Sequence, residues 1–281
     1  MKSDTVSTLE VACLGPEGSF SHLLAGMRFP EGRRVCLASI GEVFDYLGSR
    51  ELALGIVPIE NSSGGFIIDT VDRLLDPRCG LRIQEELTLD VKLALLGHAG
   101  ETVTEIHSHP MPFFHCDAWL QEHYPEAARV EQPSTAIAAA EAAKGFSVAA
   151  IGSRQNADRH GLDVLHYPIA GEVPNVTQFF LIGHEDRAPV EADERTGLVV
   201  ELPDNPGSLC RFLTPLSDSG VNMKRLESRP IRGQPNKYRF YIEIEGSPAL
   251  EPVKKALEMA AADGAGIRSL GSYPASSRFV T

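Results

Sequence analysis

The sequence predicts an α/β protein in which a large two-lobed domain is followed by a smaller domain. Short β-rich runs alternate with helix-like segments up to residue 183, a rhythm that is typical of α/β folds. Segment 184–197 then interrupts this rhythm, because it is charged and has no periodicity, and we expect a linker there. Beyond the linker the elements follow another order, which predicts a separate domain.

The large domain is predicted to span residues 8–185 and to consist of two similar α/β halves. In the first half we expect strands at 9–15, 34–39 and 52–60, and helices at 19–27 and 40–49. The continuous apolar run 52–60 is typical of a strand that is buried on both faces, so we expect largely parallel sheets.

The second half is predicted over about residues 87–165. We expect strands near 87–97, 128–132 and 146–153, and helices within 109–125 and 134–145. A strand at 175–183 closes the domain. Because the chain passes from the first half to the second and back, we expect a central cleft between the two halves. Such a cleft is a common place for a small-molecule site.

The region after the linker is predicted to be a domain of its own over residues 196–275. Its strands are expected at 197–204, 224–231, 237–246 and 267–274, and its helices at 205–220 and 250–264. The resulting order, βαββαβ, is the ferredoxin-like pattern.

The composition excludes several classes of partner and location. The net charge is −12, from 38 acidic and 26 basic residues, so neither a nucleic acid nor an anionic membrane is an expected partner. The five cysteines lack paired spacing, and the first ten residues have no apolar core. Both features predict a cytoplasmic protein with reduced thiols.

Polar residues mark the starts of two predicted helices. Ser19 and Ser21 lie at a glycine-rich turn from strand to helix, and Ser134 and Thr135 open an alanine-rich helix. Free N–H groups at a helix start favour anions, but serine and threonine are also ordinary helix caps there. The residues alone favour capping and leave an anion site open.

Polar residues also mark the ends of two predicted strands. Asn61 and Ser62 follow the apolar run 52–60, at the strand end where open α/β sheets place ligands. Thr177 and Gln178 precede Phe179 near the start of strand 175–183. Thr177 either simply suits a strand or donates a proton to a ligand.

A cluster of histidines raises the question of a metal site. The group consists of His107, His109, His115 and Cys116. Their spacing fits no standard zinc pattern, so no metal is predicted.

Taken in order, these stretches resemble the prephenate dehydratase family. GPEGSFSH, GIVPIENSSGG, SHP, STAIAA and NVTQFFLIG are similar to its motifs, and ELPDNPGSL and LESRP are similar to the two loops of a regulatory ACT domain. The resemblance implies a two-lobed, periplasmic-binding-protein-like catalytic domain with a C-terminal ferredoxin-like ACT domain. Some members carry an N-terminal chorismate mutase domain; this chain begins almost at its first strand, so we expect a monofunctional enzyme.

The resemblance also implies a reaction and its residues. Prephenate loses carbon dioxide and water to give phenylpyruvate, in phenylalanine biosynthesis, without a metal or organic cofactor. The resemblance makes Thr177 the proton donor, with Gln178 and Ser62 as further catalytic residues. The implied substrate-binding residues are Ser19, Ser21, Asn61, Ser134, Thr135 and Phe179.

Two departures from the family pattern leave alternatives open. Gln178 stands where the family has arginine, and Met111 stands where it has glutamine. The loss of one charge-assisted hydrogen bond weakens carboxylate binding by roughly 1.5 to 3 kcal/mol, unless Arg154 or Lys144 substitutes. The alternatives are arogenate dehydration, decarboxylation of prephenate without aromatisation, and a non-catalytic amino-acid sensor.

The ACT resemblance implies feedback inhibition by phenylalanine in a homodimer or homotetramer. The implied effector-binding residues are Asn205, Pro206, Gly207, Ser208, Leu209, Glu227, Ser228, Arg229 and Pro230. From the residues alone, these positions are also compatible with simple turns.

Overall fold

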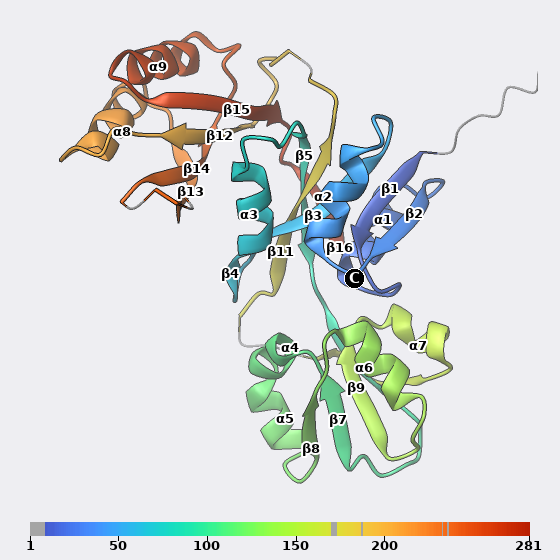
Figure 1. Cartoon of the computed structure of the whole chain (residues 1–281). Helices are drawn as coiled ribbons and strands as arrows, with labels where there is room; N and C mark the ends of the chain where they lie inside the picture. The colour runs from blue at the N-terminus through green and yellow to red at the C-terminus, as the bar shows by residue number, and fades with distance from the viewer. Residues whose placement is uncertain (1–8, 170–172, 187, 232, 235) are drawn as a thin grey trace, which may run out of the picture.

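The computed structural model describes residues 9–169, 173–186, 188–231, 233–234 and 236–281 (Figure 1). The described residues form three sheets, one in each lobe of the large domain and one in the C-terminal domain. This arrangement confirms the predicted fold class. The domain limits 8–185, 87–165 and 196–275 remain predictions.

The first lobe is a mixed sheet with the strand order β16-β5-β11-β3-β1-β2, with β4 attached to β3. The strands are β1 (Glu10–Leu14), β2 (Arg33–Leu37), β3 (Leu54–Asn61), β4 (Gly65–Phe66), β5 (Arg82–Asp90), β11 (Val176–Gly183) and β16 (Ser277–Val280). Helix α1 (Phe20–Arg28) packs on one face, and α2 (Ile40–Gly48) and α3 (Ile68–Leu75) pack on the other.

The second lobe is a sheet with the order β10-β6-β9-β7-β8. Its strands are β6 (Leu93–Gly97), β7 (Glu105–Ser108), β8 (Ala128–Glu131), β9 (Val148–Gly152) and β10 (Asp163–Ile169). Its helices are α4 (Pro110–His115), α5 (Asp117–His123), α6 (Thr135–Ala142) and α7 (Gln155–His160). The predicted helix within 109–125 is thus two helices that meet at Cys116.

The C-terminal domain has the predicted βαββαβ order. Its elements are β12 (Arg195–Glu201), α8 (Ser208–Asp218), β13 (Met223–Pro230), β14 (Tyr238–Glu245), α9 (Glu251–Ala262) and β15 (Gly266–Tyr273), with the strand order β13-β14-β12-β15. Tyr241 and Tyr273 are fully buried beside Phe180 of β11, with ring centroids 6.3 and 5.7 Å from it. The domain therefore packs on the same face of the first sheet as α2 and α3.

The expectation of largely parallel sheets is wrong. Strand β11 runs antiparallel to both β3 and β5, and β6 runs antiparallel to β9 and β10. The cause is the double crossing between the lobes. The chain leaves β5 for the second lobe, and when it returns it enters the first sheet from the edge that faces the second lobe, so β11 points the opposite way from β3.

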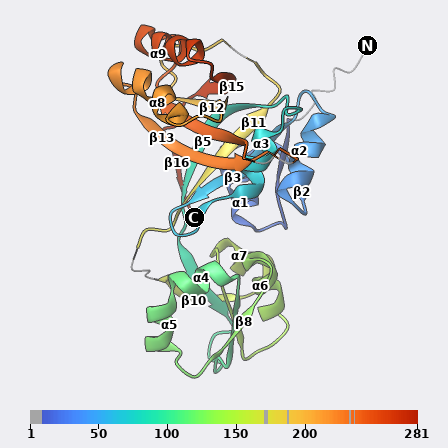
Figure 2. The ribbon, with the colours of Figure 1, turned by 60° about the vertical axis from the view of Figure 1, so that its left-hand side comes forward.

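The last strand, β16, was not predicted. After the C-terminal domain, the chain returns to the first lobe and pairs in parallel with β5, with Ser277 opposite Leu87 and Val280 opposite Asp90. Figure 2 shows the end marked C at the waist between the two lobes. Among the described residues, no helix is both long and apolar enough to cross a membrane.

Candidate active site

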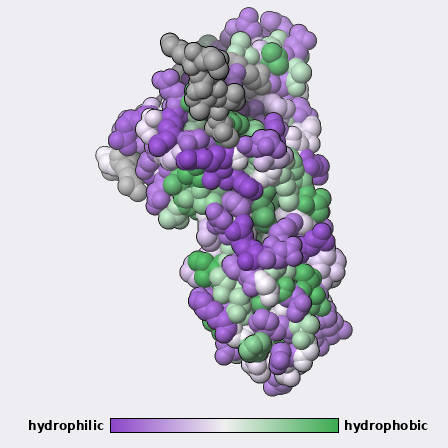
Figure 3. Space-filling model, turned by 90° about the vertical axis from the view of Figure 1, so that its right-hand side faces the viewer, coloured by the Kyte–Doolittle hydropathy of each residue, from purple (hydrophilic) through white to green (hydrophobic). Residues whose placement is uncertain are grey.

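The topology brings several predicted residues to one edge of the first sheet. Parallel strands β1 and β3 end at this edge, and antiparallel β11 begins there. Asn61 ends β3, Thr177 lies at the start of β11, and Ser19 follows β1. This edge faces the second lobe (Figure 1), and Figure 3 shows that the molecule narrows between the two lobes.

Asn61 and Thr177 are in direct contact. They are paired in register, and Asn61 Nδ2 donates a hydrogen bond of 2.9 Å to Thr177 Oγ1. Asn61 Oδ1 accepts from the N–H groups of Ser63 and Gly64 at 2.9 and 3.0 Å, which fixes the amide orientation. Because Thr177 Oγ1 accepts a hydrogen bond from Asn61, its own proton is available to a ligand.

Ser62 holds the two strands together. Its Oγ donates to the carbonyl of Pro174 at 2.8 Å and accepts from the N–H of Val176 at 3.0 Å. A hydroxyl has one proton, so the Ser62 proton is already used in this arrangement. The geometry therefore favours a structural role for Ser62, whereas the resemblance implies a catalytic one.

The two predicted helix starts are capped as the residues indicate. Ser19 caps α1, since its Oγ accepts from the N–H of His22 at 3.2 Å and donates to the carbonyl of Leu14 at 2.7 Å. Ser134 caps α6 through the N–H of Ile137 at 3.1 Å. Ser21 and Thr135 are buried. Of the two caps, Ser134 is the one whose proton is not used in these contacts.

Gln178 and Phe179 lie differently from Thr177. Side chains alternate along a strand, so Gln178 points to the opposite face from Thr177, where it is the register partner of Glu60 and Thr88. Phe179 returns to the face of Thr177 and is 2% exposed in the apolar core. The structure thus does not bring Gln178 to the side of the sheet that carries the Thr177 hydroxyl.

The two candidate cations are placed at opposite ends of the second lobe. Arg154 follows the end of β9 that faces the first lobe, and its guanidinium lies 5.0 Å from the ring centroid of Tyr167. Lys144 lies beyond the far end of α6 and pairs with Glu141 at 2.7 Å. Of these two cations, Arg154 lies at the end of the second lobe that faces the first lobe, and it is therefore the stronger candidate for binding an anion.

The second lobe contacts the loop before α1. Asn156 of α7 is fully buried and donates to the carbonyl of Gly18 at 3.2 Å, and Arg159 pairs with Glu17 at 2.7 Å. The hydrogen bond from Arg159 lowers the pKa of Glu17. Burial lowers the pKa of His22, whose Nδ1 accepts the N–H of Gly18 at 3.2 Å.

Met111 also lies at the junction of the lobes. A Cβ atom at Gly64, three residues after Asn61, would lie 3.6 Å from Met111 Cε. The residue that departs from the family pattern thus faces the loop that holds the Asn61 amide. Neither this contact nor the Asn156–Gly18 contact could be predicted from the sequence, since each joins segments that are far apart in the chain.

His107 and His109 of the predicted histidine cluster have different partners. His107 contacts Glu105 at 3.2 Å and Gln132 at 3.1 Å, and His109 accepts from the N–H of Met111 at 3.3 Å as the cap of α4. Burial lowers the pKa values of His109 and His115. Burial raises the pKa of Cys116 to about 12.

The predicted effector residues lie at one end of the C-terminal sheet. Strands β12 and β13 both run antiparallel to β14, so their ends point the same way. Asn205–Leu209 follow β12, and Glu227–Pro230 end β13. Gly207 has φ +80, a conformation that favours glycine. Arg229 forms an ion pair with Asp72 of α3, with Nε 2.7 Å from Oδ1.

These features define a class of protein: a two-lobed α/β domain with polar groups at the interlobe edge, joined to a ferredoxin-like domain. Residues 11–187 match the family model described as prephenate dehydratase, and residues 196–259 match the ACT domain. The chain belongs to the prephenate dehydratase family.

Similar proteins agree with this assignment. The bifunctional chorismate mutase/prephenate dehydratase of Pseudomonas aeruginosa is 33% identical over 271 residues, which cover 95% of this chain and 73% of that protein. The prephenate dehydratase of Mycolicibacterium vanbaalenii is 31% identical, with 94% of this chain and 90% of that protein covered.

Two solved structures have nearly the same fold. The prephenate dehydratase from Arthrobacter aurescens, in complex with L-Phe, has a TM-score of 0.85 and 30% identity, covering 95% of this chain and 90% of that one. GqqA, described as a novel type of quorum quenching acylase, has a TM-score of 0.86 and 27% identity, covering 95% and 98%.

Proposed function

We propose that this chain is a prephenate dehydratase, which removes carbon dioxide and water from prephenate and releases phenylpyruvate for phenylalanine biosynthesis. The observation that carries the proposal is the hydrogen bond of 2.9 Å from Asn61 Nδ2 to Thr177 Oγ1. This bond orients the Thr177 hydroxyl and leaves its proton for a substrate oxygen.

In the proposed reaction two bonds of prephenate break. The electron pair of the bond to the ring carboxylate enters the ring, and carbon dioxide leaves. The C4 hydroxyl departs with the Thr177 proton as water, and Thr177 regains a proton from solvent. Aromatisation drives the reaction, so a weak acid is sufficient if it is held in place, which is the role of Asn61.

Substrate recognition is assigned to groups at both sides of the lobe junction. Arg154 is the proposed ligand of a substrate carboxylate, since a guanidinium binds carboxylates with charge-assisted hydrogen bonds. The hydroxyl of Ser134 is proposed to bind a further polar group. Ser62 is assigned to holding the ends of β3 and β11 together.

Identification of the product tests the proposal. Purified protein is incubated with prephenate and, separately, with arogenate, and the products are identified by mass spectrometry. Phenylpyruvate from prephenate supports the proposal. A non-aromatic keto acid, turnover of arogenate alone, or no turnover would instead indicate a decarboxylase, an arogenate dehydratase or a sensor. Amide hydrolysis is assayed in parallel, because GqqA is described as an acylase.

The ACT domain is proposed to bind phenylalanine and to inhibit turnover. The support is the complex of the Arthrobacter aurescens relative with L-Phe and the common end at which Asn205–Leu209 and Glu227–Pro230 lie. We further propose a cytoplasmic homodimer or homotetramer in which ACT domains pair. Light scattering with and without phenylalanine measures the oligomeric state, and isothermal titration calorimetry measures binding.

A further inference from the structure

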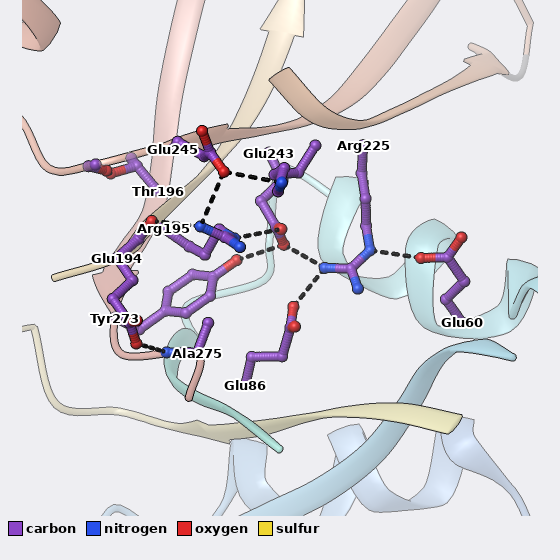
Figure 4. Close-up of polar contacts among 12 residues, drawn as sticks. Glu60, Glu86, Glu194, Arg195, Thr196, Arg225, Glu243, Glu245, Tyr273 and Ala275 are labelled. Atoms are coloured by element: carbon purple, nitrogen blue, oxygen red, sulfur yellow. Dashed lines mark hydrogen bonds and ion pairs between the residues drawn. The ribbon is translucent and has the colours of Figure 1, made fainter. Parts of the chain in front are cut away.

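A buried cluster of charges joins the ACT domain to the first lobe (Figure 4). Its centre is Arg225 of β13, whose side chain is only 6% exposed. Arg225 Nε lies 2.7 Å from Glu60 Oε2 of β3, and its Nη1 contacts Glu86 of β5 and Glu243 of β14. Two of the three carboxylates belong to the first lobe and one to the ACT domain.

Arg225 is the main cation that compensates the buried carboxylates of this cluster. Burial alone lowers its pKa, but the carboxylates of Glu243 and Glu86 outweigh burial and raise the pKa above its usual range. Burial raises the pKa of Glu86. Arg195 approaches Glu243 at 3.7 Å. Removing Arg225 would leave carboxylates buried without their main cation, which is strongly unfavourable.

The residue that follows Glu60 is Asn61. Along a strand, neighbouring side chains point to opposite faces. Glu60 accordingly reaches Arg225 on the ACT side, while the Asn61 amide binds Thr177 Oγ1 on the other. The last two residues of β3 are thus held by different parts of the molecule, one by the ACT domain and one by the proposed proton donor.

We infer that Arg225 and Glu60 are positioning residues that fix the end of β3 and thereby set how Asn61 holds the Thr177 hydroxyl. The inference rests on the proposed function of Thr177. Strand β13 also contains the predicted effector residues Glu227–Pro230. If effector binding displaces β13, the displacement reaches the donor through the Arg225–Glu60 ion pair, the peptide unit between Glu60 and Asn61, and the hydrogen bond from Asn61 to Thr177.

The variant Glu60→Gln tests this connection with little risk to folding. It keeps the shape of the side chain, and Arg225 retains Glu86 and Glu243 as partners. We expect kcat to fall about fivefold, which corresponds to roughly 1 kcal/mol, while KM changes less than about twofold. The inhibition by phenylalanine should weaken, and the melting temperature should stay near that of the parent protein.

A matched control breaks another ion pair between β13 and the first lobe. Asp72→Asn removes the partner of Arg229, whose Nε lies 2.7 Å from Asp72 Oδ1. Asp72 belongs to α3 and does not adjoin Asn61. If docking of the domains alone mattered, both variants would lower kcat equally; we expect Asp72→Asn to keep the parent kcat.

A second variant leaves every residue of the cluster in place. Gln178 is the register partner of Glu60, so Gln178→Arg offers Glu60 a competing guanidinium. Because arginine is the family's residue at this position, the readout for this variant is the NMR signal of the Thr177 methyl group, which we expect to shift as it does in Glu60→Gln. Gln178→Met, which offers no charge, serves as its control and should leave the Thr177 methyl signal unchanged.

A readout that does not need turnover separates this inference from the proposed function. In protein with 13C-methyl-labelled threonine, the Thr177 methyl signal should shift in Glu60→Gln and in Gln178→Arg, but not in Asp72→Asn. If the parent protein fails to convert prephenate, the proposed function fails and the methyl signal alone decides the coupling. An unchanged methyl signal together with parent kcat and parent inhibition in Glu60→Gln would overturn the inference.

Discussion

The hydroxyl of Thr177 is the group on which the proposed chemistry depends. In Thr177→Val the side chain keeps its shape but has no proton to give, so kcat should fall by a factor of about 10² to 10⁴, the usual contribution of a general acid. KM should change little, since the proton is needed only as the C–O bond breaks. Steady-state rates of phenylpyruvate formation measure both constants.

Thr177→Ser is the matched control, because it keeps a hydroxyl at the same position and the same bond from Asn61. It should retain most of the activity that Thr177→Val loses. A valine variant that turns over prephenate at the parent rate would rule out this hydroxyl as the donor.

Arg154 is the proposed ligand of a substrate carboxylate. Loss of a hydrogen bond to a charged group costs roughly 1.5 to 3 kcal/mol, so Arg154→Ala should raise KM about tenfold or more. Lys144→Ala is the control, since Lys144 lies at the far end of α6 and pairs with Glu141. Equal effects of the two substitutions on KM would contradict the assignment.

The motifs located residues at strand ends, but the contacts of these residues depend on the fold. Asn61 and Thr177 were expected at strand ends, and the structure joins them by a hydrogen bond. The role of Ser62 depends on Pro174 and Val176, which lie more than 100 residues further along the chain. The motif predicts that Gln178 belongs to the site, but strand alternation directs its side chain to the face opposite Thr177.

At the scale of single elements, the C-terminal end of α3 is a site of acid sensitivity. The side chain and the N–H of Arg78 donate to Asp76, and these bonds lower the pKa of Asp76 to about 2 from its ordinary value of 3.8. Because the folded-state pKa lies below the unfolded one, the stabilisation is present above pH 3.8 and is lost as the pH falls toward 2.

Asp76→Asn should abolish this part of the pH dependence. The shift is equivalent to about 2.4 kcal/mol for a fully buried pair, but Asp76 and Arg78 are 30% and 89% exposed, so we expect about 1 kcal/mol. Urea unfolding of the parent protein and of Asp76→Asn measures the difference in their free energies of unfolding. The comparison runs from pH 5 down to pH 2, as far as both proteins remain folded. Parallel pH profiles for parent and variant would show that the Asp76–Arg78 contact does not stabilise the fold.

Local sequence patterns predict the helices and strands more reliably than they predict how the strands pair. The pattern of apolar residues correctly predicted the order of strands and helices in the C-terminal domain. The direction of β11 could not be predicted in this way, because it depends on the chain crossing to the second lobe and back. The break between β5 and β6 at residues 91–92 has the same origin.

At the scale of the whole molecule, contacts between distant segments decide how the domains are joined. Arg225 is one of 26 basic residues, and its neighbours in sequence do not distinguish it from a surface cation. Only the fold shows that it is buried among carboxylates from three strands. Burial of a guanidinium requires such partners, which a sequence does not show when they lie in another domain.

The terminal segment joins the ACT domain to the lobe junction. Strand β16 pairs with β5, and Thr281 Oγ1 accepts the N–H of Lys92 at 2.9 Å in the crossing between lobes. The hydroxyl of Tyr167, in the second lobe, donates to the carbonyl of Thr281 at 2.7 Å. Residues that follow the ACT domain in sequence therefore contribute to the catalytic domain.

Phe279 provides the apolar part of this attachment, since it packs against a buried apolar cluster that includes Leu87 and Leu89 of β5. Phe279→Ala should lower the free energy of unfolding by about 1 to 3 kcal/mol, less than for a fully buried phenylalanine because the side chain is partly exposed. The neighbour Val280 is 59% exposed, so Val280→Ala should change the free energy of unfolding by less than about 0.5 kcal/mol. Denaturant unfolding measures the loss in the free energy of unfolding. Hydrogen exchange measures the loss of protection of the β5 amides. If Phe279→Ala behaved like Val280→Ala, β16 would not stabilise the catalytic domain, and the ACT domain would be tied to it chiefly through the contacts of Arg225 and its neighbours.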